Sequence, residues 1–250
     1  MADVSTGAVN HTSSEARRSR IVRFSLGERL VHRSVAILML TCIATAAILY
    51  NGFLAVPVGH RRLVKLVHVF SGYALPIPIL LGLVSAAYRS DLGRLNRFSP
   101  SDWRWLRSRR RRDGAIRVAK FNAGQKLNGA LSTGSIIVML LTGTLMYVPD
   151  LARLSWRTGA SFVHDWFALA LGLLVIGHIS FAVRDPESRR GMRTGSVSAS
   201  WARRHHSSWA AELGVAEEAT DPEAAEPAAS ESDAADPDAA DPSRVDRPVI

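Results

Sequence analysis

Four of the eight histidines lie within, or at the ends of, long apolar stretches of the sequence: His32, His68, His164 and His178. An ionisable side chain at membrane depth is costly to leave unpaired, so such a residue marks a functional site by default. Two imidazoles from facing helices are what a six-coordinate haem iron needs, one on each side of the porphyrin. We therefore examine these histidines first as axial ligands of haem.

The single cysteine, Cys42, narrows the chemistry further. One cysteine excludes an internal disulfide, an iron–sulfur cluster and a thiolate zinc site. It also excludes the C-x-x-C-H attachment of a covalent haem. Any metal must be held by histidine or oxygen, and any haem should be bound non-covalently as haem b.

The elements that position these histidines are four runs of apolar residues, each long enough to cross a hydrocarbon core of ~30 Å. We expect an all-α, four-helix transmembrane bundle with spans at about 31–56, 64–88, 124–148 and 160–184. The fourth span includes Asp165, next to His164. We interpret Asp165 as an interfacial acid in the headgroup region. The alternative is that Asp165 orients the ligand His164 or contacts a partner subunit.

Lys and Arg residues set the expected orientation, because positively charged flanks stay in the cytoplasm. They crowd the segment 1–28, the loop 89–123 and the region after the fourth span, and they are sparse in the other two loops. We expect a multi-pass protein of the cell (inner) membrane with both termini cytoplasmic. Because the basic residues flank apolar spans, the net charge of +9 does not indicate nucleic-acid binding.

The two ends of the chain differ in composition from the bundle, which we place at residues 29–210. The first 28 residues contain no apolar core of signal-peptide length, and we read Arg17 and Arg18 as a juxtamembrane basic cluster rather than a twin-arginine signal. Residues 211–250 consist largely of Ala, Asp, Glu and Pro. Such a segment buries too little apolar surface to offset its conformational entropy, so we expect a disordered acidic tail.

The depths of the four histidines match in pairs. Counting from the predicted span ends puts His32 and His178 near the cytoplasmic face, and His68 and His164 near the outer face. His178 follows His164 by fourteen residues, which is ~21 Å along a helix and 40° short of four full turns, so both project from nearly the same face. One helix can therefore serve two haem sites. Satisfied core residues, a proton relay or metal transport are the alternatives, and the spans hold no acid besides Asp165 and no inverted repeat that would favour transport.

Four stretches of the chain resemble the cytochrome b (gamma) subunit of respiratory formate dehydrogenases, over about residues 21–210. They read RFSLGERLVHR, FNAGQKLNGALSTGSIIVMLLTG, SFVHDWFALALGLLVIGHISFAV and GMRTGSVSASWARRHH. The resemblance implies a four-helix membrane bundle with two b haems that passes electrons to a membrane quinone. It implies that His68 and His164 hold the outer haem and that His32 and His178 hold the inner one.

The resemblance also implies a quinone site beside the inner haem, with Asn122, Gly124 and Gln125 at the start of the third span. From the residues alone, Asn122 is equally an N-cap of that span. The chain departs from the family at Arg33, where a Trp is usual, in a sparser match around His68, and in the acidic tail.

The implied partners are an iron–sulfur electron-transfer subunit, a catalytic formate dehydrogenase subunit reached through it, and membrane lipid. Formate oxidation itself would take place on another subunit. Two other functions stay open at this point: the cytochrome b subunit of a hydrogenase or another iron–sulfur oxidoreductase, and a membrane anchor without redox function.

Overall fold

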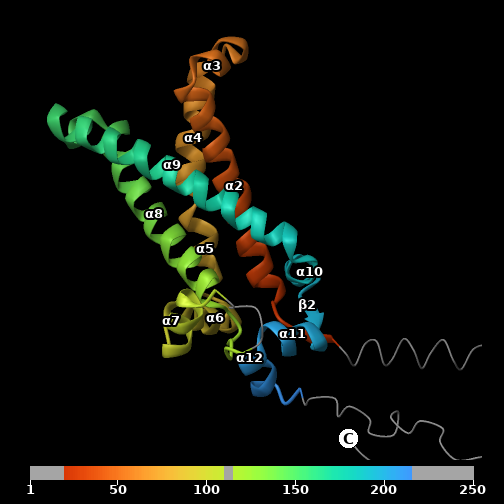
Figure 1. Cartoon of the computed structure of the whole chain (residues 1–250). Helices are drawn as coiled ribbons and strands as arrows, with labels where there is room; N and C mark the ends of the chain where they lie inside the picture. The colour runs from red at the N-terminus through yellow and green to blue at the C-terminus, as the bar shows by residue number, and fades with distance from the viewer. Residues whose placement is uncertain (1–19, 110–114, 216–250) are drawn as a thin grey trace, which may run out of the picture. The chain divides into compact units, whose positions relative to one another are not determined.

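The computed structural model describes residues 20–109 and 115–215. These residues form twelve helical segments and two short strands (Figure 1). The strands are β1 (Arg20–Val22) and β2 (Ser196–Ser198). The helices are α2 (Leu26–Tyr50), α3 (Gly52–Val58), α4 (Arg61–Ala74), α5 (Pro76–Gly82), α6 (Ala86–Asn96), α7 (Pro100–Arg107), α8 (Ala123–Tyr147), η1 (Pro149–Leu151), α9 (Leu154–Arg184), α10 (Pro186–Thr194), α11 (Ala199–His205) and α12 (Ser207–Glu212).

Four helical stretches of the described chain are long and apolar enough to cross a membrane: α2, α4 with α5, α8 and α9. Their ends differ from the hydropathy estimate because caps, rather than apolar runs, decide where a helix starts and stops. A capping box of Ser25 and Glu28 begins α2 five residues before the expected start. The second span ends at Gly82 rather than near residue 88, because Ser85 caps a new helix, α6. The fourth begins at Leu154 rather than near residue 160.

The four spans meet in one apolar core. Met39, Leu75, Ile136 and Leu171 are all buried there, and each comes from a different span. Within the bundle α2 packs against α4 and α5, and α8 lies along α9 (Figure 1). Large apolar side chains elsewhere on the spans point outward, among them Phe70, Leu141, Leu173 and Phe181. An apolar surface of this extent fits a lipid environment.

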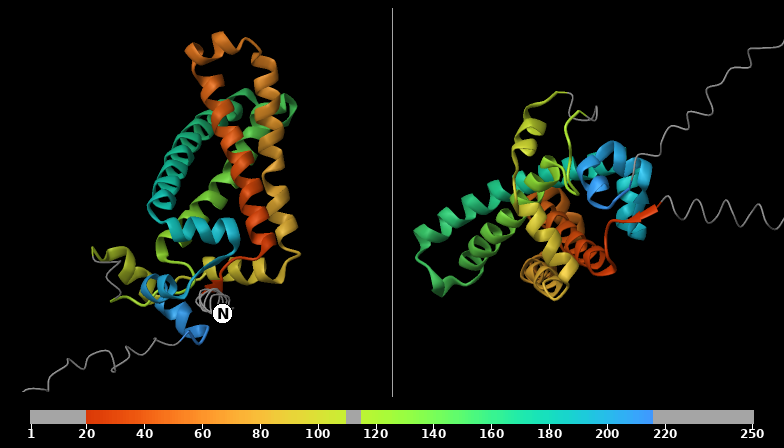
Figure 2. Two further views of the ribbon diagram at one scale, coloured as in Figure 1. Left: turned by 90° about the vertical axis from the view of Figure 1, so that its right-hand side faces the viewer. Right: turned by 90° about the horizontal axis from the view of Figure 1, so that it is seen from below.

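The two ends of the bundle domain are joined at one end of the spans. Strand β1 pairs antiparallel with β2, with Ile21 opposite Val197 (Figure 2). The turn before β2 requires glycine, because Gly195 has φ +92° and a Cβ there would lie 2.7 Å from the carbonyl oxygen of Phe24. Both ends of the bundle domain therefore lie on the same side of the spans, as an even number of crossings demands.

The segments between and after the spans are more ordered than the composition indicated. The region 89–123, expected as a basic loop, contains part of α6 and all of α7. At the C-terminal side, Trp201 and Trp209 pack with Val197, Ala202 and Ala210 into a small second core. The predicted acidic tail was placed from residue 211, but α12 runs to Glu212. Residues 216–250 lie outside the described residues.

Candidate haem sites

The four intramembrane histidines meet in two pairs. The rings of His32 on α2 and His178 on α9 have centroids 6.1 Å apart, and those of His68 on α4 and His164 on α9 are 6.3 Å apart. We call them the inner pair and the outer pair, after the sides of the membrane that the charge pattern predicts. These are the pairs that the depth count brings together.

The spacing within each pair fits a shared iron. A metal–imidazole bond of about 2 Å on each side of one ion, plus about 1 Å from nitrogen to ring centre, gives a centroid separation of about 6 Å. Among residues 20–109 and 115–215 there is no group of three or more His, Cys, Asp or Glu side chains that could hold a bare metal ion. A pair of imidazoles suits haem iron, because the porphyrin itself supplies the other four nitrogens.

The imidazole of His68 is oriented by a hydroxyl group on the neighbouring helix. Thr45 Oγ1 lies 2.7 Å from the carbonyl oxygen of Thr41, to which it donates, and 2.9 Å from His68 Nδ1. A hydroxyl that donates its one hydrogen elsewhere must accept from the imidazole. His68 therefore carries its proton on Nδ1, which also lies 3.2 Å from the carbonyl oxygen of Cys42. Nε2 is left with a lone pair for a metal.

His164 repeats the arrangement. Thr142 Oγ1 donates to the carbonyl oxygen of Val138 at 2.7 Å and lies 2.9 Å from His164 Nδ1. A Cβ at Gly143 would come within 3.3 Å of the His164 ring, so this glycine leaves room for the imidazole. Sequence reasoning missed Thr45 and Thr142. The available signal was a threonine at the depth of a histidine on the adjacent span, but other Ser and Thr residues in the same spans obscure it.

Free space surrounds several glycines of the spans. A Cβ added at Gly72, Gly134, Gly172 or Gly177 would meet no atom within 4 Å among the described residues. Close helix packing, the ordinary use of small residues in membrane helices, therefore does not explain these four positions. The open space at these positions would leave room for a flat macrocycle.

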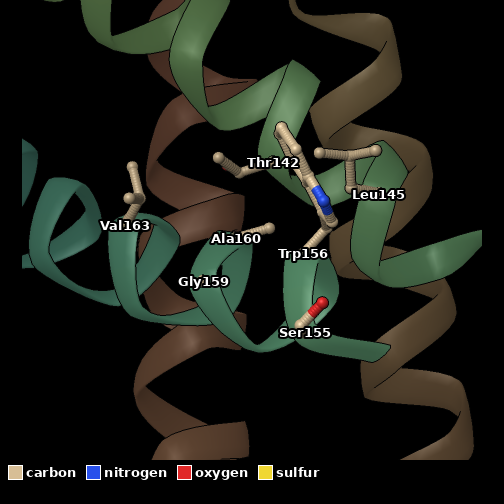
Figure 3. Close-up of a pocket in the computed structure, with 7 residues that line it drawn as sticks. All are labelled: Thr142, Leu145, Ser155, Trp156, Gly159, Ala160 and Val163. Carbon is tan, nitrogen blue, oxygen red and sulfur yellow. The ribbon is translucent and has the colours of Figure 1, made fainter. Parts of the chain in front are cut away.

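A shallow, open groove with a volume of about 460 Å³ lies between α8 and α9 beside the outer pair. Thr142, which contacts His164, forms part of its wall, and Trp156 and Leu145 face it from the ends of the two helices (Figure 3). Its lining is predominantly apolar. The outer pair is therefore bordered on this side by space that an apolar group can fill.

The residues considered for a quinone site form the N-terminal cap of α8. Asn122 Oδ1 accepts a hydrogen bond from the Gln125 backbone N–H at 2.9 Å, and Gln125 Oε1 accepts from the Asn122 backbone N–H at 3.0 Å. Neither amide NH2 group has a hydrogen-bond partner among the described residues. A Cβ at Gly124 would lie 3.2 Å from the Trp105 ring, so glycine allows this close contact. The capping role is thus present, and two amide donors remain beside it.

Two lysines with acidic partners, the buried Lys126 and the partly buried Lys120, lie at this end of the bundle. Lys120 Nζ is 2.5 Å from Asp91 Oδ2 and 3.9 Å from Glu28 Oε1, whereas Lys126 Nζ is 2.7 Å from Asp102 Oδ2. Burial raises the pKa of Asp91 to about 7, and Glu28 adds to this while Lys120 opposes it. For Asp102, burial is outweighed by hydrogen bonds from Lys126 and Ser99, so its pKa lies below its usual range.

Behind this cluster, Arg23 and His206 connect the two ends of the bundle domain. His206 Nδ1 donates to the carbonyl oxygen of Ala119 at 2.7 Å, and its Nε2 lies 3.3 Å from Arg23 NH2 and must accept from it. Burial, reinforced by the charge of Arg23, lowers the pKa of His206 to about 3, so this ring is neutral. Burial likewise lowers the pKa of Arg23 to about 10. The sequence does not indicate that His206 is buried, because its burial depends on tertiary packing.

Comparison with known proteins identifies the family. The sequence pattern described as prokaryotic cytochrome b561 matches residues 23–195. The chain belongs to this family. The matched region contains both histidine pairs, α8, Lys120 and Lys126. The chain is therefore an integral membrane protein, and its family implies haem b as the cofactor.

Curated relatives refine the comparison. The chain is 31% identical over 103 residues to the cytochrome b556(Fdn) subunit of the nitrate-inducible formate dehydrogenase of Escherichia coli K12, and equally to that of Shigella flexneri. These matches cover 40% of this chain and 48% of the relative, so the chain spans about half the length of these relatives. It is 23% identical over 210 residues to the formate dehydrogenase cytochrome b556(fdo) subunit of Escherichia coli K12, covering 79% of this chain and 95% of that one. The resemblance to formate dehydrogenase cytochrome b subunits is thus confirmed.

Proposed function

We propose that this chain is the membrane cytochrome b subunit of a respiratory formate dehydrogenase complex, passing electrons from an iron–sulfur subunit through two b haems to a membrane quinone. The observation that carries the proposal is the presence of two histidine pairs with ligand spacing, separated by fourteen residues along α9. The named relatives are cytochrome b subunits of formate dehydrogenases.

The protein's own residues would hold and orient the cofactors. His68 and His164 would be axial ligands of the outer haem, and His32 and His178 those of the inner one. Bound haem supplies reversible one-electron chemistry at each position. The hydroxyl groups of Thr45 and Thr142 hold the outer imidazoles in the tautomer that a metal requires. Ligands ~21 Å apart along one helix would bring the two cofactor edges much closer than that.

The quinone site would lie at the start of α8, beside the inner pair. Asn122 and Gln125 use their amide oxygens for the helix cap, which fixes both side chains and leaves the NH2 groups to donate to a quinone carbonyl. Gly124 lies between them. In the proposed orientation both ends of the bundle domain, and with them this site, face the cytoplasm. That orientation is supported by the distribution of Lys and Arg and by the pairing of β1 with β2.

The test is the reduced-minus-oxidised absorption spectrum of the purified protein, with haem counted against protein. Two non-covalent b haems per chain are expected. The reduced haems should be reoxidised when a short-chain quinone is added. A ratio of one or of zero in well-folded protein would refute the two-haem assignment, and haems that stay reduced in the presence of quinone would refute the quinone reaction. Co-purification with a catalytic subunit that oxidises formate, rather than hydrogen or another substrate, distinguishes the formate dehydrogenase assignment from a hydrogenase or another donor.

A further inference from the structure

The most unusual polar group in the described chain is a buried pair of carboxyl groups with one shared lysine. Glu28 on α2 is 7% exposed and Asp91 on α6 is 6% exposed. Lys120 Nζ makes a hydrogen bond of 2.5 Å to Asp91 but stays 3.9 Å from Glu28. Two carboxylates against one close ammonium leave excess negative charge in a desolvated place, which is costly. One shared proton removes that excess.

The hydrogen-bond pattern points to the same proton. Glu28 Oε2 accepts from the backbone N–H of Ser25 at 2.6 Å. Glu28 Oε1 is buried and receives no hydrogen bond from any nitrogen or hydroxyl donor among the described residues. Interaction with Glu28 helps to raise the pKa of Asp91, and Asp91 can donate a hydrogen bond to Glu28 only when it is protonated. A proton on Asp91 would therefore satisfy an acceptor that is otherwise left unpaired.

The position of this pair matters for the proposed quinone reaction. Glu28 precedes the inner-pair residue His32 by four residues, one turn or about 6 Å along the same face of α2. Lys120 precedes the candidate quinone residue Asn122 by two residues. Helix α6, which carries Asp91, packs against α8. The carboxyl pair is thus linked through Glu28 to the inner histidines and through Lys120 to the start of α8.

We propose that Glu28 and Asp91 hold one proton between them and deliver it, past Lys120, to the quinone that is reduced at the start of α8. This inference rests on the proposed function. Reduction of one quinone to quinol takes two electrons, supplied by reduced haem, and two protons. In each proton transfer the Asp91 O–H bond breaks, an O–H bond forms on a quinone oxygen, and the Asp91 carboxylate then regains a proton from water. Two such transfers complete one quinol.

The charged groups facing Asp91 make it suited to this task. They are Glu28 from α2, Lys120 before α8, and Arg23, whose charge acts on Asp91 from the segment after β1. With a pKa of about 7, Asp91 can both lose and regain its proton near neutral pH, which is what a general acid requires. Asp102 provides the contrast. Its single carboxylate faces a single ammonium, that of Lys126, and stays ionised.

The test uses the haem-loaded protein, chemically reduced and mixed with a short-chain quinone between about pH 5 and pH 9. In the wild type, haem reoxidation should slow as the pH rises above about 7, where Asp91 has lost its proton. Asp91→Asn should keep both haems, reoxidise them about 10²-fold more slowly and lose this pH dependence. Asp91→Glu should restore part of the rate and the pH dependence. The matched control, Asp102→Asn, removes the other buried carboxylate at this end and should keep the wild-type pH profile.

A second readout needs no quinone. Infrared spectroscopy of the wild type should show the C=O band of a protonated carboxyl group that titrates near pH 7, and Asp91→Asn should lack it. Absence of the band in the wild type at low pH would overturn the inference, as would an Asp91→Asn variant with the wild-type rate and pH profile. If quinone does not reoxidise the wild-type haems at all, the proposed quinone reaction itself is wrong. That result is distinguishable from a missing infrared band or an unchanged Asp91→Asn variant, which contradict only the proton-transfer inference.

Discussion

The outer and inner histidine pairs have nearly the same ring separation but very different surroundings. Each outer imidazole is fixed by a threonine hydroxyl, whereas neither His32 nor His178 has a hydrogen bond to its ring among the described residues. On the inner side, Glu28 lies one helical turn before His32, and Lys120, which contacts Asp91 and lies 3.9 Å from Glu28, shortly precedes the cap of α8. The outer site is built for a fixed ligand geometry, and the inner one is placed beside groups that can exchange protons and donate hydrogen bonds.

Removing a ligand should have the largest effect and should separate the two sites. His164→Ala should lose the outer haem and halve the haem content, because one imidazole cannot hold the iron from both sides. Chemically reduced inner haem should still be reoxidised by quinone in that variant. His178→Ala should lose the inner haem and, with it, quinone reduction. Haem content by absorption and reoxidation by stopped flow measure both. Equal loss of both haems in either variant would mean that the two sites are not independent.

Removing the threonine hydroxyls should affect the outer site alone. Thr142→Val deletes the hydroxyl acceptor of His164, and Thr45→Val deletes the nearer of the two acceptors of His68. Each change should weaken haem retention at the outer site about 10- to 100-fold. Because the ligand becomes less basic, the reduction potential of the outer haem should also rise. Thr144→Val is the matched control, since Thr144 makes the same bond to a preceding carbonyl but pairs with Tyr73 instead of a histidine. Haem titration and redox potentiometry decide the outcome, and a control with the same loss would contradict the assignment.

These two sites also show how far sequence reasoning reached. Depth and periodicity are local properties of a helix, so counting residues was enough to bring His164 and His178 to one face and to match each with a partner. The Thr45–His68 contact depends on how α2 and α4 are rotated against each other, and no count of residues gives that. The cluster of Glu28, Asp91 and Lys120 joins three separate segments, two of which lie in the region 89–123 that had been expected to be a loop.

Gln125 allows the cap of α8 to be separated from the proposed quinone contact. Gln125→Glu keeps an oxygen to accept from the Asn122 backbone N–H but loses the NH2 donor, whereas Gln125→Leu loses both. If the NH2 group binds quinone, both variants should slow haem reoxidation by about 5- to 10-fold, the value of one hydrogen bond, with haem content unchanged. The rate of reoxidation by a short-chain quinone is the measurement. A Gln125→Glu variant with the normal rate, beside an impaired Gln125→Leu, would show that Gln125 only caps the helix.

Lowering the pH should destabilise the segment behind the inner site. His206 is neutral when folded, with a pKa of about 3, whereas an unfolded histidine has a pKa of about 6.5. Between pH 3 and pH 6.5 the unfolded segment therefore binds more protons than the folded one. The folded segment has its full stability above pH 6.5 and loses stability as the pH falls toward 3, by at most about 1.4 kcal/mol per pH unit. Hydrogen exchange of residues 196–212, corrected for the intrinsic effect of pH, should report this loosening. His206→Gln can still donate to Ala119 and accept from Arg23 but cannot take up a proton, so its exchange should depend far less on pH. The outer loop at η1, which has no histidine, should show no such dependence in either protein, and an equal slope in His206→Gln would contradict the assignment to His206.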